Sequence, residues 1–335
     1  MKGIGNFIYD LRIKINRLFA RGAGSRRAGR SFRRTRKKEL IFCLLMIAVP
    51  VTQVAIFYFG VNANSILMAF QRYDSVATAF KWAGFTNFKA VIHDIFKLNA
   101  LRIGAKNSMI IYAVGILISM PLNIFFAYFL YKKVPLSGFY RVILFMPAII
   151  SGVVLALIFK YFVEYGVPSV LDAVKIKNYP NFLRSPDWSF IVIIVYGLWA
   201  GFGAGLLLYN SAMTKIPYDL IEYGQIEGAT MFQEFFKITV PLIFPTITTF
   251  LVIGLAGIFT AQGAVFMFYG SDAEQYMYTY GYYFFTRIVS SVGVRENYSS
   301  YPYVAASGLI FTLIAAPLTL LLKYLLEKFV PSAEF

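Results

Sequence analysis

The sequence lacks most of the side chains from which catalytic and metal sites are built. It contains one cysteine, Cys43, and one histidine, His93, among 335 residues. A single cysteine cannot form an intrachain disulfide, and a single histidine leaves almost nothing for a His-based metal site or catalytic triad. The phosphate-binding pattern G-x-x-x-x-G-K-[ST] is also absent. We therefore predict that the chain has no catalytic residues, needs no metal or cofactor, and is not an enzyme.

Charge is scarce as well. Charged residues make up 14% of the chain and hydrophobic residues 59%, whereas average soluble domains carry roughly 25% charge. Because so little polar surface cannot cover a water-soluble globule of this size, we expect an all-α membrane protein. Six apolar segments are long enough to cross a bilayer of about 30 Å as helices. These predicted spans are 40–60, 109–131, 142–163, 189–209, 243–268 and 303–322. The alternative, a large soluble protein, would have to bury six such helices.

No charged residue lies deep in these predicted spans. Secondary transporters and pumps usually need such residues in the membrane interior to carry protons or ions. Energy for any transport is therefore expected from another chain, although a channel or secondary transporter remains an alternative. A membrane enzyme would need a cluster of histidines or acids at a membrane face, and the sequence offers none.

Positive charge gathers before the first span. The tail 1–39 holds 13 Lys and Arg residues, opposed only by Asp10 and Glu39. The positive-inside rule therefore predicts a cytoplasmic tail and, with six spans, a cytoplasmic C-terminal segment, 330–335. The net charge of +16 also suggests nucleic acid. Because the tail has few aromatics and adjoins a membrane helix, a topology signal that contacts anionic lipid explains it better.

The predicted cytoplasmic segment 211–241 is too long for a simple connector. Pro217 suits the start of a short helix, and Gly228 can end that helix in a left-handed conformation. Thr230 and Gln233 have the spacing of a capping box that would begin a second helix. The pattern predicts two short helices joined at a glycine corner.

The second of these helices is predicted to have an apolar face. Met231, Phe235 and Ile238 recur at helical spacing, and Pro241 closes the helix at the membrane. An apolar face on an acidic loop favours docking into a groove of a partner protein. A helix pair lying on lipid is the alternative, although such helices usually carry Lys and Arg.

The same loop carries a resemblance to a known family. The run Glu222-Tyr-Gly-Gln-Ile-Glu-Gly228-Ala-Thr, followed by Ile238-Thr-Val-Pro241, resembles the EAA signature of ABC importer permeases. Nine residues separate the glycine from the isoleucine, as in that family. The sequence departs from the signature in having Tyr223 and Gly224 for two alanines, Glu227 for aspartate and Val240 for leucine. Weaker matches, in the family's order, lie at 84–88, 146–148, 198–203 and 303–308.

The resemblance covers about 40–329 and implies the type I ABC importer permease fold, with six spans and a cytoplasmic coupling helix pair. It implies a bacterial inner-membrane location and four kinds of partner: a second permease forming a heterodimer, two ABC ATPases, an extracytoplasmic solute-binding protein, and a carbohydrate substrate. The resemblance is to the carbohydrate-type subfamily, and the chain is similar to the larger permease of maltose-type systems. A polyol or glycerol phosphate remains an alternative substrate.

The resemblance also assigns site residues. The expected ATPase-coupling residues are Glu222, Glu227, Gly228, Ala229, Met231, Phe235, Ile238 and Pro241. The two glutamates are expected to meet cationic groups of the ATPase, or else to be ordinary exposed acids near helix ends. The candidates for the substrate path are Tyr196, Trp199, Gly203 and Gln262, with ordinary packing as an equal alternative. The tyrosine-rich stretch 269–303 is expected to form an interfacial aromatic belt or, less favoured, to contact sugar or binding protein.

Overall fold

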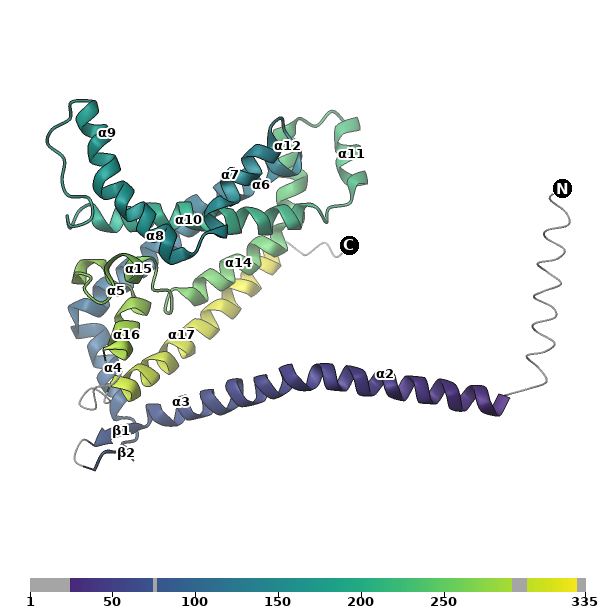
Figure 1. Cartoon of the computed structure of the whole chain (residues 1–335), viewed down its shortest axis with the longest axis horizontal. Helices are drawn as coiled ribbons and strands as arrows, with labels where there is room; N and C mark the ends of the chain where they lie inside the picture. Colours follow the sequence, from purple (N-terminus) through teal and green to yellow (C-terminus); the bar gives the residue numbers. More distant parts are fainter. Residues whose placement is uncertain (1–24, 75–76, 291–299, 330–335) are drawn as a thin grey trace. The chain divides into compact units, whose positions relative to one another are not determined.

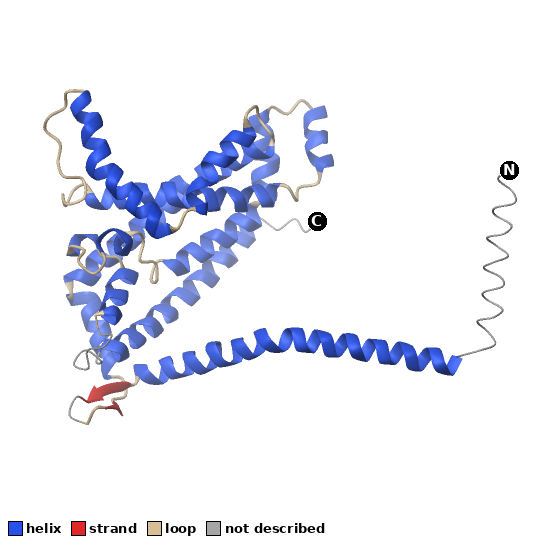
Figure 2. Ribbon diagram, in the orientation of Figure 1, coloured by secondary structure: helices blue, strands red, loops and turns tan. Residues whose placement is uncertain are grey.

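The computed structural model describes residues 25–74, 77–290 and 300–329. Most of the basic tail, 1–24, and the C-terminal segment 330–335 therefore lie outside the described residues. The chain divides into two units, residues 1–65 and 66–335, which are described separately. Helices dominate the described residues, in which Figure 2 shows one small pair of strands.

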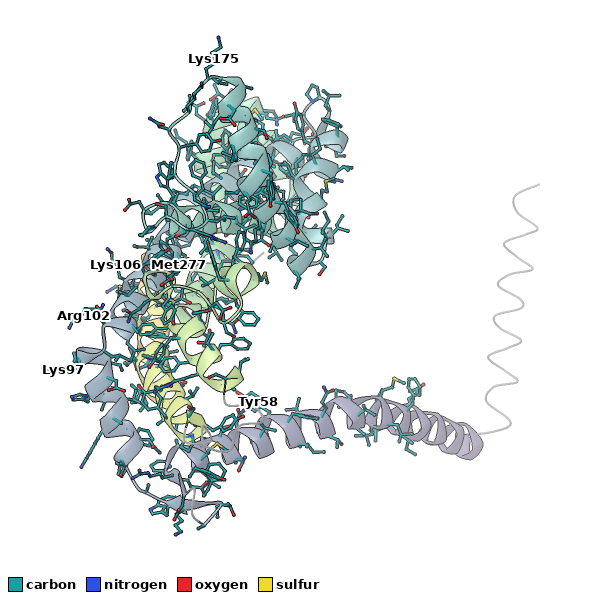
Figure 3. The ribbon with its side chains drawn as sticks, turned by 60° about the vertical axis from the view of Figure 1, so that its left-hand side comes forward. Tyr58, Lys97, Arg102, Lys106, Lys175 and Met277 are labelled. Carbon is teal, nitrogen blue, oxygen red and sulfur yellow. The ribbon has the colours of Figure 1, made fainter. Side chains whose placement is uncertain are left out.

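The described part of the first unit is one long helix. α2 (Ser25–Gln53) continues through the π-helical turns of η1 (Val54–Val61) into α3 (Asn62–Ala69). Its apolar side chains are exposed, as Tyr58 illustrates with 65% of its surface accessible (Figure 3). From Glu39 to Ala69 the helix is apolar enough and long enough to cross a membrane, where exposed apolar side chains face lipid. This stretch contains the predicted first span, 40–60.

A β-hairpin, which the all-helical expectation omitted, follows α3. β1 (Gln71–Asp74) pairs antiparallel with β2 (Ala79–Trp82). Asn87, in α4 (Thr86–Lys97), donates from Nδ2 to the carbonyl oxygens of Ala69 and Gln71, at 2.8 and 2.7 Å. This side chain therefore ties the end of α3 and the first strand to α4.

The second and fourth predicted spans are continuous helices. The second consists of α5 (Asn99–Val114), the π-helical η2 (Gly115–Ser119) and α6 (Met120–Tyr131). The fourth is α10 (Ser189–Met213). Both helices begin or end beyond the predicted limits, 109–131 and 189–209, because polar residues extend each helix past its apolar run.

The third predicted span, 142–163, is broken in the structure. α7 (Ser137–Ile149) ends before Ile150 and Ser151, which are extended, and a new helix begins at Gly152. The new helix consists of α8 (Gly152–Tyr161), η3 (Phe162–Gly166) and α9 (Val167–Ala173). Only the part from Gly152 to Ala173 is long enough to cross a membrane. Pro147 removes one backbone donor from the last turn of α7, which helps to end that helix there.

The fifth predicted span, 243–268, ends earlier than expected. α14 (Phe244–Gly257) is followed by an irregular segment containing Gly263, whose φ is +60°, and then by α15 (Val265–Tyr269). A bend of 63° separates α14 from the helical stretch Met231–Leu242 before it. The remaining elements are η5 (Gln275–Met277), α16 (Tyr280–Val289) and α17 (Ser300–Phe329), the last of which contains the predicted sixth span, 303–322. The described helices thus supply five candidate spans, or six if the bent pair is one span.

Three clusters of buried side chains hold the second unit together. α10 packs along α6 and α7, and α14 packs beside α17, which also contacts α4 and α16 (Figure 1). Gly203 allows the close crossing of α10 and α7, because a Cβ there would lie 2.8 Å from the carbonyl oxygen of Leu144. The cluster containing Tyr128, Phe235 and Ile243 fixes the end of α6 against the segment that follows α11.

Candidate functional site

The loop between α10 and α14 forms two short helices joined at a corner. α11 (Tyr218–Ile226) ends at Gly228, and α12 (Met231–Glu234) follows. The N–H of Ala229 donates to the carbonyl of Gly224 at 2.9 Å, and the N–H of Gly228 donates to that of Gln225 at 3.0 Å. These two bonds are the Schellman pattern that ends helices. The φ of +80° at Gly228 confirms its predicted left-handed conformation.

Local side-chain bonds begin the second helix. The Thr230 hydroxyl accepts from the N–H of Gln233 at 3.4 Å, and the Gln233 carboxamide oxygen accepts from the N–H of Thr230 at 2.8 Å. The predicted capping box is therefore confirmed. With the Schellman pattern immediately before it, the box leaves the corner little backbone freedom. Pro217 precedes α11 as its N-cap residue rather than as its first helical residue.

The predicted apolar face needs correction. Phe235 is 6% exposed and packs inside the molecule, with its ring 4.9 Å from that of Tyr128. Ile238 is half-buried and packs against Gly224. A Cβ atom built at Gly224 would lie 2.6 Å from the Cδ1 atom of Ile238. Of the three residues expected on one face, only Met231 is exposed. The helix becomes π-helical in η4 (Phe235–Thr239), which changes the number of residues per turn and breaks the predicted periodicity.

Other side chains form the exposed apolar surface of the loop. We call four of these side chains the crest: Tyr223, Ile226, Phe232 and Phe236, which are between 60% and 75% exposed. Tyr218 and Met231 of the same loop are exposed as well. Glu222 and Glu227 are exposed on the same loop. Ala229 is half-buried in the corner between α11 and α12. Pro241 is exposed in α13 (Val240–Leu242), just before the 63° bend. The crest therefore combines aromatic and aliphatic surface with two carboxylates.

A buried ion pair that the sequence did not reveal lies behind the crest. Glu234 is 2% exposed, and its Oε1 and Oε2 atoms each lie 2.9 Å from Nζ of Lys132, the residue after α6. The Tyr128 hydroxyl lies 3.1 Å from Oε1, and Nε2 of Gln225 donates to Oε2 at 3.3 Å. Lys132 and Glu234 are 102 positions apart, so sequence spacing gives no sign that they meet.

A cavity of about 500 Å³ lies between the second span, α10 and α14. Five glycines contribute to its wall: Gly115, Gly201, Gly205, Gly254 and Gly257. Tyr112, Ser119, Asn123 and Tyr209 add polar groups to a wall that is otherwise apolar. Among the described residues that line it, none is charged. The sequence did carry a signal for this surface, because Gly201 and Gly205 stand four positions apart in α10.

The four residues predicted for the substrate path do not line this cavity. Tyr196 is buried and donates to the carbonyl of Gly152 at 3.1 Å, and Gly203 packs against α7. The Trp199 ring is stacked on that of Phe159, with centroids 5.6 Å apart. Gln262 lines a separate hollow of about 300 Å³ next to α16 and α17. Packing thus accounts for Tyr196 and Gly203, whereas Trp199 is 41% exposed. The assignment of these residues to the path stays a prediction.

Three described tyrosines of the stretch 269–303, namely Tyr269, Tyr276 and Tyr282, donate their hydroxyl groups to backbone carbonyls. The Tyr269 hydroxyl donates to the carbonyl of Leu183 at 2.6 Å, and the Tyr282 hydroxyl donates to that of Gly270 at 2.9 Å. Burial, together with the nearby Tyr276 hydroxyl, raises the pKa of Tyr269 to about 12, so it remains a neutral donor. The Tyr269 bond joins the segment after α14 to the loop before α10, and the Tyr282 bond joins α16 to the residue after α15. Residues 291–299 of the stretch lie outside the described residues.

Known proteins to which the chain is similar are components of transport systems. Residues 119–334 match the family described as binding-protein-dependent transport system inner membrane component. The chain is similar to the multiple sugar-binding transport system permease protein MsmF of Streptococcus mutans, with 26% identity over 85% of this chain and 94% of the relative. It is also similar to the sn-glycerol-3-phosphate transport system permease protein UgpA of Escherichia coli, with 25% identity over 63% of this chain and 70% of that protein.

Solved structures share the fold. A chain of a bacterial ABC transporter involved in the import of the acidic polysaccharide alginate aligns with 89% of this chain and 99% of its own length, with a TM-score of 0.68 and 22% identity. A second structure, of the bacterial alginate ABC transporter in complex with an alginate pentasaccharide-bound periplasmic protein, gives a TM-score of 0.69 and 20% identity. At this identity the likeness establishes the type I ABC importer permease fold.

Proposed function

Because the chain belongs to the family of binding-protein-dependent transport system inner membrane components, we propose that it forms half of the translocation path of an ATP-driven importer. It is a permease of the inner membrane. Its partners in this proposal are a second permease, two ATPase subunits that supply the energy, and an external binding protein that delivers the solute. The match to the family over more than half of the chain carries this proposal.

The loop between α10 and α14 is proposed as the contact with one ATPase. Its corner is held by the Schellman bonds at Gly228 and the capping box at Thr230, so the loop can transmit a push without bending. The crest gives the groove of a partner an apolar surface to bury, and the exposed Glu222 and Glu227 can pair with cationic groups around it. Membrane orientation follows from this contact, with the loop in the cytoplasm.

The cavity is proposed as this chain's part of the solute path. Its glycines leave room between the second span, α10 and α14, and the Tyr209 hydroxyl can bond a polar solute. The Tyr112 hydroxyl donates to the carbonyl of Leu251 at 3.1 Å and can only accept from a solute. The absence of charge among its described lining residues favours a neutral solute. Carbohydrate agrees with this, and also with the sugar named for MsmF.

An uptake experiment tests the function. The chain, tagged and expressed with its native partners, should bring down an ATPase and a second membrane-spanning chain when purified. In liposomes, the complex with its binding protein should accumulate a radiolabelled oligosaccharide only when ATP is inside. Accumulation of labelled sn-glycerol 3-phosphate instead would assign a phosphate solute. Purification of the chain alone, with no ATPase in any detergent, would contradict the importer itself.

A further inference from the structure

The Lys132–Glu234 pair, in which Glu234 is buried and the Lys132 side chain is 22% exposed, is not explained by stability alone. Replacing a buried ion pair with apolar residues of similar size is often neutral or stabilising, because both charges lose their hydration. Here the aromatic cluster around Phe235 already fixes the loop to the second span. An ion pair adds what apolar packing lacks, namely bonds with fixed directions. Both Glu234 carboxylate oxygens lie 2.9 Å from the Lys132 ammonium, and further bonds from Tyr128 and Gln225 restrict how the carboxylate can turn.

One carboxylate joins three elements. Glu234 belongs to α12, and its oxygens receive bonds from Lys132 and Tyr128 at the end of α6. They also receive a bond from Gln225 of α11, on the other side of the glycine corner. The Tyr128 hydroxyl lies 3.1 Å from the carbonyl of Met231 as well. Both helices of the loop are therefore bonded, through the buried Glu234 carboxylate, to the end of one membrane span.

The same span leads directly to the cavity. Asn123, two turns before Tyr131 in α6, lies against Gly205 of α10. A Cβ atom built at Gly205 would be only 2.6 Å from the Oδ1 atom of Asn123. Asn123 and Gly205 both line the cavity. The π-helical η2, which precedes α6, lines it too, and such irregular turns are frequent where helices have a functional role. A rotation of α6 at its loop end would therefore move the cavity wall.

We propose that the Lys132–Glu234 pair is a rigid joint that makes the coupling loop and the second span move as one body, so that ATPase motion reaches the cavity through α6. The proposal rests on the proposed function of the loop. Lys132 and Glu234 are positioning residues, because they contact neither nucleotide nor solute. They fix the angle between the crest and the span.

A distance measurement tests the joint in the wild-type network. With Cys43→Ser removing the one native cysteine, spin labels are placed at Lys133→Cys and Lys237→Cys, two exposed positions on either side of the joint. The distance between the labels should stay the same in nucleotide-free complex and in complex trapped with ATP and vanadate. A shift upon trapping that exceeds the width of the distance distribution would overturn the proposal, because the loop would then move independently of α6.

Variants test whether the joint carries the coupling. Glu234→Gln and Lys132→Gln should each lower the stimulation of ATP hydrolysis by the binding protein by about tenfold, while the ATPase still co-purifies. The exchanged pair Lys132→Glu/Glu234→Lys should restore much of it. Lys133→Gln is the control, because Lys133 is the exposed neighbour of Lys132 and should leave stimulation unchanged.

The outcomes separate the two proposals. Full stimulation in Glu234→Gln at equal levels of assembled complex would reject the joint and leave the importer standing. Where the single variants do not assemble, the exchanged pair and the label distance decide, because an exchanged pair that assembles without regaining stimulation also rejects the joint. Failure of the wild-type chain to bind any ATPase would instead reject the proposed function.

Discussion

At the corner between α11 and α12, backbone conformation alone requires glycine. The φ of Gly228 is +80°, and a Cβ built there would meet nothing within 4 Å inside this chain. Alanine at this position should therefore cost about 1–2 kcal/mol in backbone strain, without an internal clash. A β-branched residue is more strained still.

Two substitutions at Gly228 therefore separate strain from contact with a partner. Gly228→Ala should reduce uptake in part, and Gly228→Val should abolish it, because a larger side chain also holds the ATPase surface away. Membrane levels should remain near wild type, since the site lies outside the spans. Uptake is measured at equal membrane levels of each variant. Wild-type uptake in Gly228→Val would reject our placement of the corner in the coupling site.

Two phenylalanines three positions apart should behave in opposite ways. Phe235 is 6% exposed and packed against Tyr128, whereas Phe232 is 60% exposed on the crest. Phe235→Ala should destabilise the chain by about 3–5 kcal/mol through the cavity that it leaves. Phe232→Ala should leave the melting temperature nearly unchanged and weaken ATPase binding. Thermal unfolding and co-purification measure the two effects, and equal ATPase binding by Phe232→Ala would exclude it from the contact.

The structural elements that could be predicted from the sequence are those determined by residues close together in the chain. Gly228, Thr230 and Gln233 each act within a few residues of their own backbone, so the corner and the capping box were readable. The break at Ile150 and Ser151 was missed because the run 142–163 is apolar apart from Ser151 and Lys160, and apolarity alone does not say where a helix bends. In the same way, composition did not distinguish α14 from the irregular segment that follows it.

Long-range contacts account for the remaining differences between the sequence-based expectations and the structure. Phe235 was expected on a docking face because helical periodicity shows which residues share a face, not whether that face meets a partner or the chain's own core. The Lys132–Glu234 pair joins elements 102 positions apart, and single charges at such distances carry no pairing signal. Tyr196 and Gly203 looked suitable for a solute path by residue type alone. Their burial against α8 and α7 depends on how the helices pack.

The stripe of glycines on α10 offers a test of the cavity. Gly201 lines it, whereas Gly197, one turn earlier on the same helix, does not. A Cβ at either position would meet nothing within 4 Å, and Gly197 faces a smaller pocket of about 160 Å³. Gly201→Leu should fill part of the cavity and lower uptake strongly while the ATPase still co-purifies. Gly197→Leu is the matched control, and equal loss of uptake in both variants would contradict our assignment of the path.

At the scale of the whole molecule, orientation in the membrane depends on few charges. Lys97, Arg102 and Lys106 project outward along α4 and α5 (Figure 3), at the end of the second span opposite Lys132 and the loop. That end is therefore not poor in positive charge, and the 13 basic residues before Leu40 have to outweigh it. The tail is thus expected to decide which side the loop faces.

Reporter fusions test this orientation. A reporter enzyme that is active only outside the cytoplasm should be inactive at the C-terminus and active when inserted after Lys175, in the segment between α9 and α10. Replacing Arg33, Arg34, Arg36, Lys37 and Lys38 with glutamine should produce a mixed population, because the remaining charges no longer favour one side clearly. Strong reporter activity at the C-terminus of the unmodified chain would place the coupling loop outside the cell. No cytoplasmic ATPase reaches that side, so this single result would also remove the basis for the proposed contact at the crest.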